Sequence, residues 1–313
     1  MYSPIPNVED TTLLDTATTT KTTPIANVAG RQSLAQTTTT TTTWHVKILT
    51  LTLWVSGLLF AAFASGHYVR RAVLGEWELW DLSDRHLYRP GQFAANLFMT
   101  THMVGGSWLM ILGPFQLISS IRRRYLTYHR IMGRSYIVAS LLTATCIMFF
   151  VVLYRTSRQD IYEDVGNLLL AIAMITCAVQ SYRHVRFTKQ LEQHKWWSYR
   201  LFALVLAALL YRLYVVAYFA VVLFTPWTGS RWVFESLFFL FFLPNLIVVE
   251  MYMRYGNKTR RILENPWLLG TGTLFVAFFT VLNVVYDWLP SVREVDVGQA
   301  SNIEHAYEIS SSS

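Results

Sequence analysis

Four polar residues lie inside stretches of this chain that are otherwise apolar, and their types suit the binding of a small molecule. An arginine such as Arg212 donates paired hydrogen bonds to a carboxylate or carbonyl, and His102, Asn245 and Asn283 both donate and accept. A charge near the centre of a bilayer costs about 2.5–3.5 kcal/mol, so it indicates a functional site by default. We predict that these four residues share a polar cavity that binds a ligand. The alternative is an interhelical hydrogen-bond network that only fixes packing.

Helix geometry supports this grouping. At 1.5 Å per residue, His102 comes to lie ~12 Å and Arg212 ~8 Å below the outer face of a ~30 Å apolar core. A lone buried charge is not tolerated, so we expect Glu235 or Asp287 to be the counter-ion of Arg212. Arg212 at this depth favours an anionic or carbonyl-bearing amphipathic ligand.

A second polar group is predicted near the opposite, cytosolic face. Its two histidines, His129 and His194, are expected at one membrane level on neighbouring helices, where they can ligate the iron of haem b from both sides. They can alternatively bind a metal with Glu250, act as an acid–base pair, or simply lie at headgroup level. Nearby basic residues can hold haem propionates or lipid phosphates. We assign a supporting role to Gln116, Arg134, Arg200 and Glu250.

Seven long apolar stretches must position these side chains. Apolar residues make up 53% of the chain and charged residues 14%, well below the roughly 25% charge of soluble domains. Each stretch is close to or above the ~20 residues that a membrane-spanning helix needs. The sequence therefore predicts an all-α, seven-transmembrane-helix bundle with spans at Ile48–Gly66, Ala94–Leu117, Ser135–Leu153, Val165–Tyr182, Trp197–Phe224, Val233–Tyr252 and Trp267–Val285.

The formal net charge of +7 does not indicate nucleic-acid binding, because the basic residues lie at the ends of the spans. Lysine and arginine gather on the cytosolic side of membrane proteins. Their distribution predicts a multi-pass protein with its N-terminus in the cytosol and its C-terminus outside or in a lumen. The sequence thus predicts the lipid bilayer as the partner of this protein.

The two ends of the chain differ in composition from the part between them. Residues 1–46 are rich in threonine and hold too little apolar surface to fold alone, and residues 289–313 are polar. We expect disordered tails at 1–46 and 289–313 around a transmembrane domain at 47–288. Within that domain, the motif beginning at His129 is repeated 65 positions later from His194, which indicates internal duplication, functional symmetry or coincidence.

Several short motifs follow one another in a fixed order between residues 94 and 250. They are His102-x-x-Gly105-Gly106, Gly113-Pro114-x-Gln116, Arg122 to Arg124, His129-Arg130-x-x-Gly133-Arg134-x-Tyr136, His194-x-x-Trp197-x-x-Arg200, Arg212-Leu213 and Pro244-Asn245-Leu246-x-x-x-Glu250. In this the chain resembles the domain of unknown function 2306 family of predicted multi-pass membrane proteins. The resemblance implies an architecture and a set of important positions, and no reaction. The usual pattern has Met where this chain has Ser198.

Three hypotheses about function remain open. In the first, the bundle binds a small amphipathic or anionic molecule through the intramembrane residues. In the second, His129 and His194 hold haem in a membrane oxidoreductase or electron-transfer protein. In the third, the protein is a small-molecule transporter, or an accessory protein whose polar residues only fix packing. Motifs of P-loop, dinucleotide-binding and common hydrolytic enzymes are missing from the sequence.

Overall fold

The computed structural model describes residues 26–83, 87–155, 161–225, 231–263 and 265–285. The chain divides into two units, Met1–Thr41 and Thr42–Ser313. Of the first unit, the described part is the beginning of one long helix, which starts at Ala26, inside the tail predicted at 1–46. The rest of that helix and all the other helices belong to the second unit. The predicted C-terminal tail, 289–313, lies outside the described residues.

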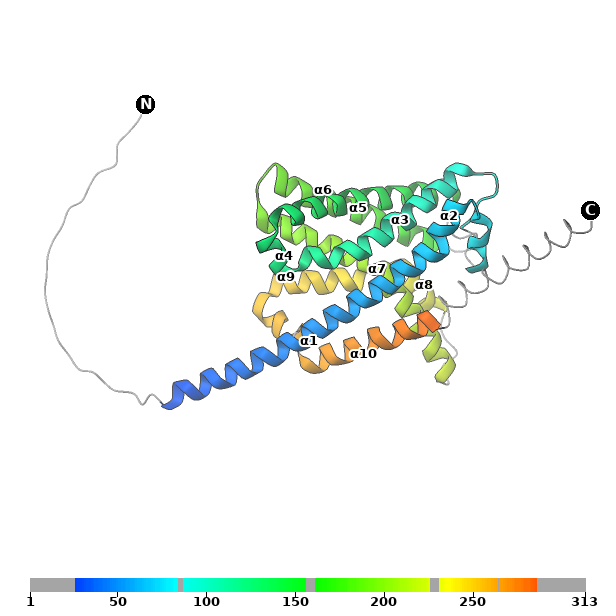
Figure 1. The fold of residues 1–313 in the computed structure, drawn as a ribbon. Coiled ribbons are helices and arrows are strands. Elements are labelled where there is room, and N and C mark those ends of the chain that lie inside the picture. The colour runs from blue at the N-terminus through cyan, green and yellow to red at the C-terminus, as the bar shows by residue number, and fades with distance from the viewer. Residues whose placement is uncertain (1–25, 84–86, 156–160, 226–230, 264, 286–313) are drawn as a thin grey trace, which may run out of the picture. The chain divides into compact units, whose positions relative to one another are not determined.

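Every regular element in the described residues is a helix, which confirms the predicted all-α class. The elements, shown in Figure 1, are α1 (Ala26–Ala64), η1 (Ser65–Val69), α2 (Arg70–Leu74), η2 (Trp77–Ser83), α3 (Phe93–Leu117), α4 (Ser119–Arg124), α5 (Leu126–Tyr154), α6 (Ile161–Arg186), α7 (Leu191–Phe224), α8 (Arg231–Leu240), α9 (Leu243–Leu263) and α10 (Pro266–Asn283).

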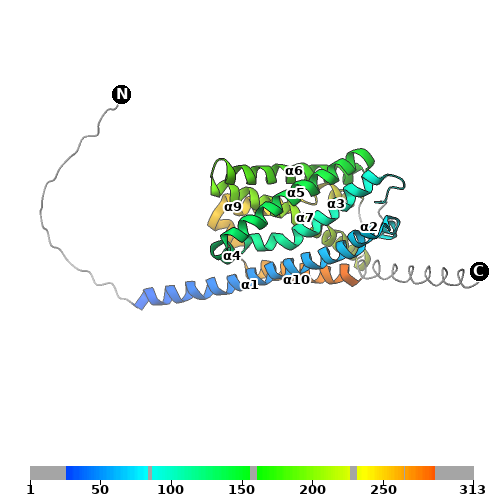
Figure 2. The same cartoon turned by 45° about the horizontal axis from the view of Figure 1, so that its top comes forward.

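The long helices α3, α5, α6 and α7 pack together as a bundle. Helix α3 packs on α5, α5 on α6, and α6 on α7, so helices adjacent in sequence are neighbours in space. Helices α1 and α10 lie side by side in both Figure 1 and Figure 2. They are joined by a hydrogen bond in which the Thr280 hydroxyl of α10 donates to Ser56 Oγ of α1 at 2.8 Å.

Five of the described helices are long and apolar enough to cross a membrane: α5, α6, α7, α10, and the helix that runs from Val46 through η1 to Leu74. Helix α3, at 25 residues, and the pair α8 and α9 are not among them. The predicted count of seven spanning helices is therefore not confirmed, although six of the seven predicted stretches are helical throughout.

The sixth predicted stretch, Val233–Tyr252, is not one continuous helix. Helix α8 ends at Leu240, and α9 begins at Leu243 after a two-residue turn. Pro244 explains the break, because its ring would clash with the carbonyl of Leu240 and it has no N–H to donate. The turn brings Phe241 and Phe242 into the core, with exposed fractions of 7% and 6%.

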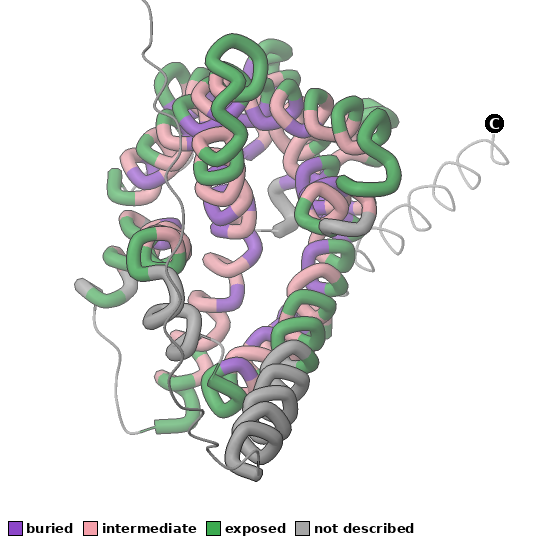
Figure 3. The backbone as a smooth tube through the Cα atoms, turned by 90° about the vertical axis from the view of Figure 1, so that its left-hand side faces the viewer, coloured by how far each residue is buried: buried purple, intermediate pink, exposed green. Residues whose placement is uncertain are grey.

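The outer surface of the bundle carries many large apolar side chains. In Figure 3, buried and exposed residues alternate along the helices, and exposed ones occur on all the long helices. Leu142, Val152 and Leu274 are among the apolar residues that are more than half exposed. A surface so rich in exposed apolar groups is unfavourable in water and suits contact with lipid tails.

The segment after α1 continues the same helix to Leu74, and η2 then packs against α2 and η1. The π-helical segment η1 and helix α2 continue α1, and Gly75, with φ of 78°, ends α2 in a left-handed conformation that favours glycine. Trp80 of η2 is completely buried, and its indole N–H donates to the Tyr68 carbonyl at 3.0 Å. Tyr68 is thereby held at the wall of a cavity inside the bundle.

Candidate functional site

A cavity of about 570 Å³ lies inside the bundle, between α1, α3, α5, α6 and α7. Its walls are mostly apolar, with side chains such as Met99, Leu109 and Met174. A smaller set of polar residues interrupts them: Tyr68, His102, Ser107, Thr143, Glu163, Asn167, Tyr211 and Arg212. A concave, largely apolar site with a few polar groups is the usual form of a small-molecule site, typically of about 300–1,000 Å³.

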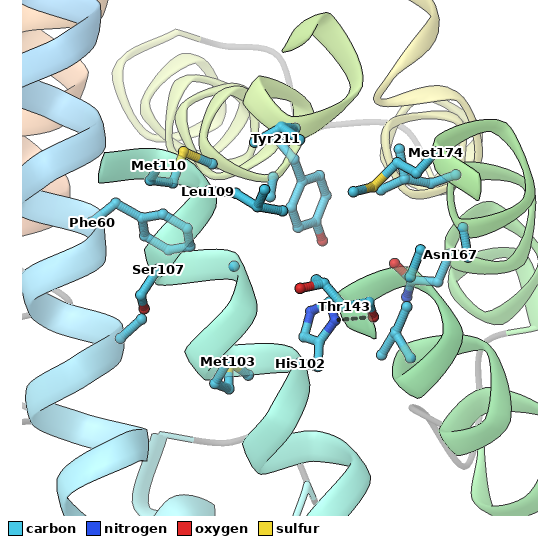
Figure 4. Close-up of a pocket in the computed structure, with 18 of the residues that line it drawn as sticks. Phe60, His102, Met103, Ser107, Leu109, Met110, Thr143, Asn167, Met174 and Tyr211 are labelled. Carbon is cyan, nitrogen blue, oxygen red and sulfur yellow. Dashed lines mark hydrogen bonds between the residues drawn. The ribbon is translucent and has the colours of Figure 1, made fainter. Parts of the chain in front are cut away.

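His102 of α3 is held in a defined orientation by α5. Its Nδ1 lies 3.1 Å from the carbonyl oxygen of Thr143, as Figure 4 shows. A carbonyl can only accept, so Nδ1 must carry the hydrogen and donate it. In the neutral imidazole, Nε2 is then the acceptor. The ring therefore offers a lone pair to a ligand hydroxyl or acid.

Arg212 of α7 lines the same cavity and packs against α1. Its guanidinium carbon lies 5.0 Å from the centre of the Phe60 ring and 5.9 Å from that of Phe63, which are cation–π distances. These contacts place the guanidinium against aromatic surface at the cavity wall. The side chain can therefore present them to an anionic or carbonyl group as an oriented donor.

The acidic residue among the described residues that line the cavity is Glu163 of α6. The sequence instead predicts Glu235 or Asp287 beside Arg212. Glu235 does not line this cavity, and Asp287 lies outside the described residues. The sequence signal for Glu163 is its four-residue spacing from Asn167, which puts both on one helix face. Figure 4 shows Asn167 and the Tyr211 hydroxyl directed toward the same space as His102.

The structure brings together His102 and Arg212 but places the two asparagines elsewhere. Asn245 lies between α9 and α7, where its amide donates to the Ala203 carbonyl at 3.3 Å and its oxygen accepts from Tyr214 at 3.4 Å. Asn283 is 1% exposed, and its amide donates to the Phe279 carbonyl of its own helix at 2.8 Å. Both asparagines therefore have roles in packing.

Two glycines beside His102 in sequence serve different purposes. A Cβ on Gly105 would lie 2.0 Å from Thr143 Oγ1, so this glycine allows α3 and α5 to approach closely. Gly106 also lines the cavity, and a Cβ there would meet no atom within 4 Å. Farther along α3, a Cβ on Gly113 would lie 2.8 Å from the Phe202 ring.

Two hydroxyls at the cavity wall add to its capacity for ligand binding. Ser107 Oγ and Thr143 Oγ1 are both buried and make no hydrogen bond with the described residues. Buried polar atoms in proteins nearly always have a partner, and each exception requires an explanation. A polar group on a ligand in the cavity would supply that partner.

The predicted supporting residues lie at the far end of the bundle. The Arg200 guanidinium of α7 donates to the Glu250 carboxylate of α9 and lies 4.6 Å from the centre of the Trp197 ring. Arg254 donates to the other Glu250 oxygen at 3.1 Å. Gln116 lies against Gly133, where an added Cβ would come within 3.3 Å of the Gln116 amide oxygen, and Arg134 is exposed.

Replacing Glu250 by Gln will destabilise the protein, because the mostly buried Arg200 loses its carboxylate partner. The side chain of Arg200 is 18% exposed, and the loss of a charged hydrogen bond there costs about 1–3 kcal/mol. Thermal unfolding in detergent measures the effect. Arg254→Gln is the matched control, since that side chain is 72% exposed and should contribute about 0.5 kcal/mol or less. Equal melting temperatures for the two variants would contradict the prediction.

The two predicted histidines lie within electrostatic range of each other at this same end. His194 Nδ1 donates to the Ser181 carbonyl at 2.9 Å, and Ser198 Oγ contacts Ser181 Oγ at 2.8 Å. Ser198 is thus part of a hydrogen-bonded group with Ser181 and His194. His129 Nδ1 is buried without a hydrogen-bond partner among the described residues.

A three-ligand metal site at these histidines is not supported. In the part of the chain that the structure describes, no three or more His, Cys, Asp or Glu residues lie together as metal ligands. Glu250, the predicted third ligand, is engaged by Arg200 and Arg254 instead. Haem ligation by His129 and His194 alone stays a prediction.

Comparison with known proteins gives one match, and it lies over the bundle. No curated protein and no solved structure matches the chain. The matched segment, residues 99–253, includes His102, Arg212, His129 and His194, whereas the phenylalanines of α1 that contact Arg212 lie outside it. Over residues 99–253 this protein is a member of the family described as "Predicted membrane protein (DUF2306)", which confirms the resemblance seen in the sequence.

Proposed function

We propose that this membrane protein binds a small amphipathic molecule, with an anionic or carbonyl-bearing head, in the cavity between α1, α3, α5, α6 and α7. The observation that carries the proposal is that His102 and Arg212, from separate helices, line one largely apolar cavity of about 570 Å³. Placing an arginine and a histidine at an apolar cavity within a membrane protein costs free energy, so such residues usually mark a functional site.

The polar groups of the cavity define how such a ligand binds. The Arg212 guanidinium donates to the acceptor oxygens of the head, and His102 Nε2 accepts from a hydroxyl or acid proton. The apolar part of the ligand packs on the methionine and leucine side chains of α3, α6 and α7. A molecule that combines an acceptor, a donor and an apolar tail can contact Arg212, His102 and the apolar wall at the same time.

Filling the cavity at Gly106 tests the proposal. We expect Gly106→Phe to abolish binding of a fluorescent polyene fatty acid to the purified, detergent-solubilised protein, because the ring occupies cavity space where no atom lies within 4 Å of the added Cβ. Fluorescence titration measures the binding. Gly270→Phe is the matched control, since Gly270 of α10 also has open space around it but lies outside the cavity. Equal binding by the wild type and Gly106→Phe would overturn the proposal.

The other hypotheses remain as alternatives with tests of their own. A transporter that moves its substrate past Arg212 would lose flux in Arg212→Ala at normal expression. An accessory protein would tolerate Arg212→Leu and His102→Leu without a phenotype. A haem protein would show a Soret band that disappears in His129→Ala or His194→Ala, and a flat visible spectrum would exclude haem binding.

We also propose that the N-terminus lies in the cytosol, because of the distribution of basic residues along the sequence.

A further inference from the structure

The corner where α4 meets α5 carries a dense positive charge. Five arginines lie between residues 119 and 134: Arg122, Arg123, Arg124, Arg130 and Arg134. Residues 87–155, which form α3, α4 and α5, contain no aspartate or glutamate at all. Figures 1 and 2 place α4 at the same end of the bundle as the turn between α6 and α7. The charge is therefore concentrated at one end of the molecule.

His129 lies among these charges. Arg122 of α4, Arg130 of its own helix and His194 of α7 are within electrostatic range of its ring. Its Nδ1 is buried and has no hydrogen-bond partner among the described residues. Cationic or protonatable groups of α4, α5 and α7 thus lie near a buried nitrogen that has no hydrogen-bond partner among the described residues. We refer to Arg122, His129, Arg130 and His194 as the basic corner.

Two described carboxylates at this end, Glu250 and Glu192, already have cationic partners. Glu250 accepts from Arg200 and Arg254, and Glu192 forms an ion pair with Lys195 at 3.8 Å. Like charges gathered at one site repel each other and raise the energy of the folded state. An anion bound between them would remove that repulsion and offer an acceptor to His129.

We propose that the basic corner binds the phosphate headgroup of an anionic membrane lipid. Apolar and aromatic side chains surround the corner on the outside, since Tyr125 and Ile131 are 64% and 56% exposed. Tyrosines are enriched where a membrane meets water, and basic pockets between helices at that level bind phosphorylated headgroups. The exposed apolar side chains provide contact for the acyl chains, which a free phosphate would not use. This site is separate from the proposed cavity and does not depend on its function.

Native mass spectrometry of the full chain in detergent tests the proposal with phosphatidic acid, phosphatidylcholine and inorganic phosphate as probes. We expect phosphatidic acid to be retained in preference to phosphatidylcholine. The double variant Arg122→Gln/Arg130→Gln should bind phosphatidic acid at least about tenfold more weakly, because each lost charged hydrogen bond is worth about that factor or more. His129→Gln should weaken it to a smaller degree.

The matched control is Arg183→Gln/Arg186→Gln, which removes two exposed charges from the end of α6 on the same side of the bundle. It should bind phosphatidic acid as the wild type does. Equal losses in both double variants would overturn the proposal, because general electrostatic attraction would then explain retention. Full displacement of the lipid by millimolar inorganic phosphate would also overturn it, in favour of a soluble phosphate ligand. Thermal unfolding of each variant verifies that the fold is intact, and binding of the fatty-acid probe should be unchanged.

Discussion

Replacing Arg212 by Gln will weaken the binding of an anionic amphipathic ligand by roughly thirtyfold or more. The substitution removes paired, charged hydrogen bonds in an apolar cavity, and a loss of about 2 kcal/mol corresponds to that factor. Fluorescence titration with a polyene fatty acid measures the change in affinity. The methyl ester and the alcohol of the same chain length should lose much less, because neither carries the negative charge that Arg212 recognises.

Arg186→Gln is the matched control for this prediction, because it makes the same substitution on an exposed part of α6. Its affinity for the fatty acid should equal that of the wild type. An equal loss for the fatty acid, the ester and the alcohol in Arg212→Gln would point to a collapsed cavity instead of a lost charge contact. Arg212→Lys helps to separate the two explanations, since it keeps the charge but not the paired donors.

Gly105→Ala will destabilise the bundle, whereas Gly106→Ala will not. At Gly105 the new methyl group would lie 2.0 Å from Thr143 Oγ1 and 3.3 Å from Thr143 Cβ, so α3 and α5 must separate. Overpacking of this kind costs about 1–3 kcal/mol. At Gly106 no atom lies within 4 Å of the added group. Thermal unfolding in detergent, monitored by circular dichroism, compares the two variants.

The same clash predicts a rescue. Thr143→Ala removes the oxygen that lies closest to the new methyl group, so Gly105→Ala/Thr143→Ala should recover most of the stability lost in Gly105→Ala. Because Thr143 also orients His102 through its backbone carbonyl, Gly105→Ala should weaken ligand binding as well. A Gly105→Ala variant as stable as the wild type would show that the two helices are not in close contact here.

The break between α8 and α9 shows how a local signal can be overlooked. Hydropathy alone joins Val233–Tyr252 into one span, because apolar residues run through most of it. Pro244 carries the contrary information, since a proline removes a helical hydrogen bond and clashes with the preceding turn. The consequence is functional, because the turn places Phe241 at the cavity wall.

The candidate site is partly predictable for a definite reason. Helix rise gives the depth of a residue, so it predicts His102 and Arg212 at similar levels, and both line the cavity. Depth does not say which way a side chain points around its helix or which helix lies beside it. Depth alone therefore groups Asn245 and Asn283 with the cavity, although they bond to Ala203 and Phe279. The sequence does not single out Glu163 as a cavity residue, because it lies in the first turn of α6, where acidic residues are common.

The sequence by itself determined that this is an all-helical membrane protein, because long apolar stretches with basic ends leave a chain few other ways to satisfy its backbone in lipid. It also identified its family through motifs that lie in order along the chain. Only the tertiary structure decided which polar residues share a cavity. That outcome depends on helix rotation and on close contacts such as Gly105 against Thr143, which arise from packing between segments distant in sequence and have no local signature.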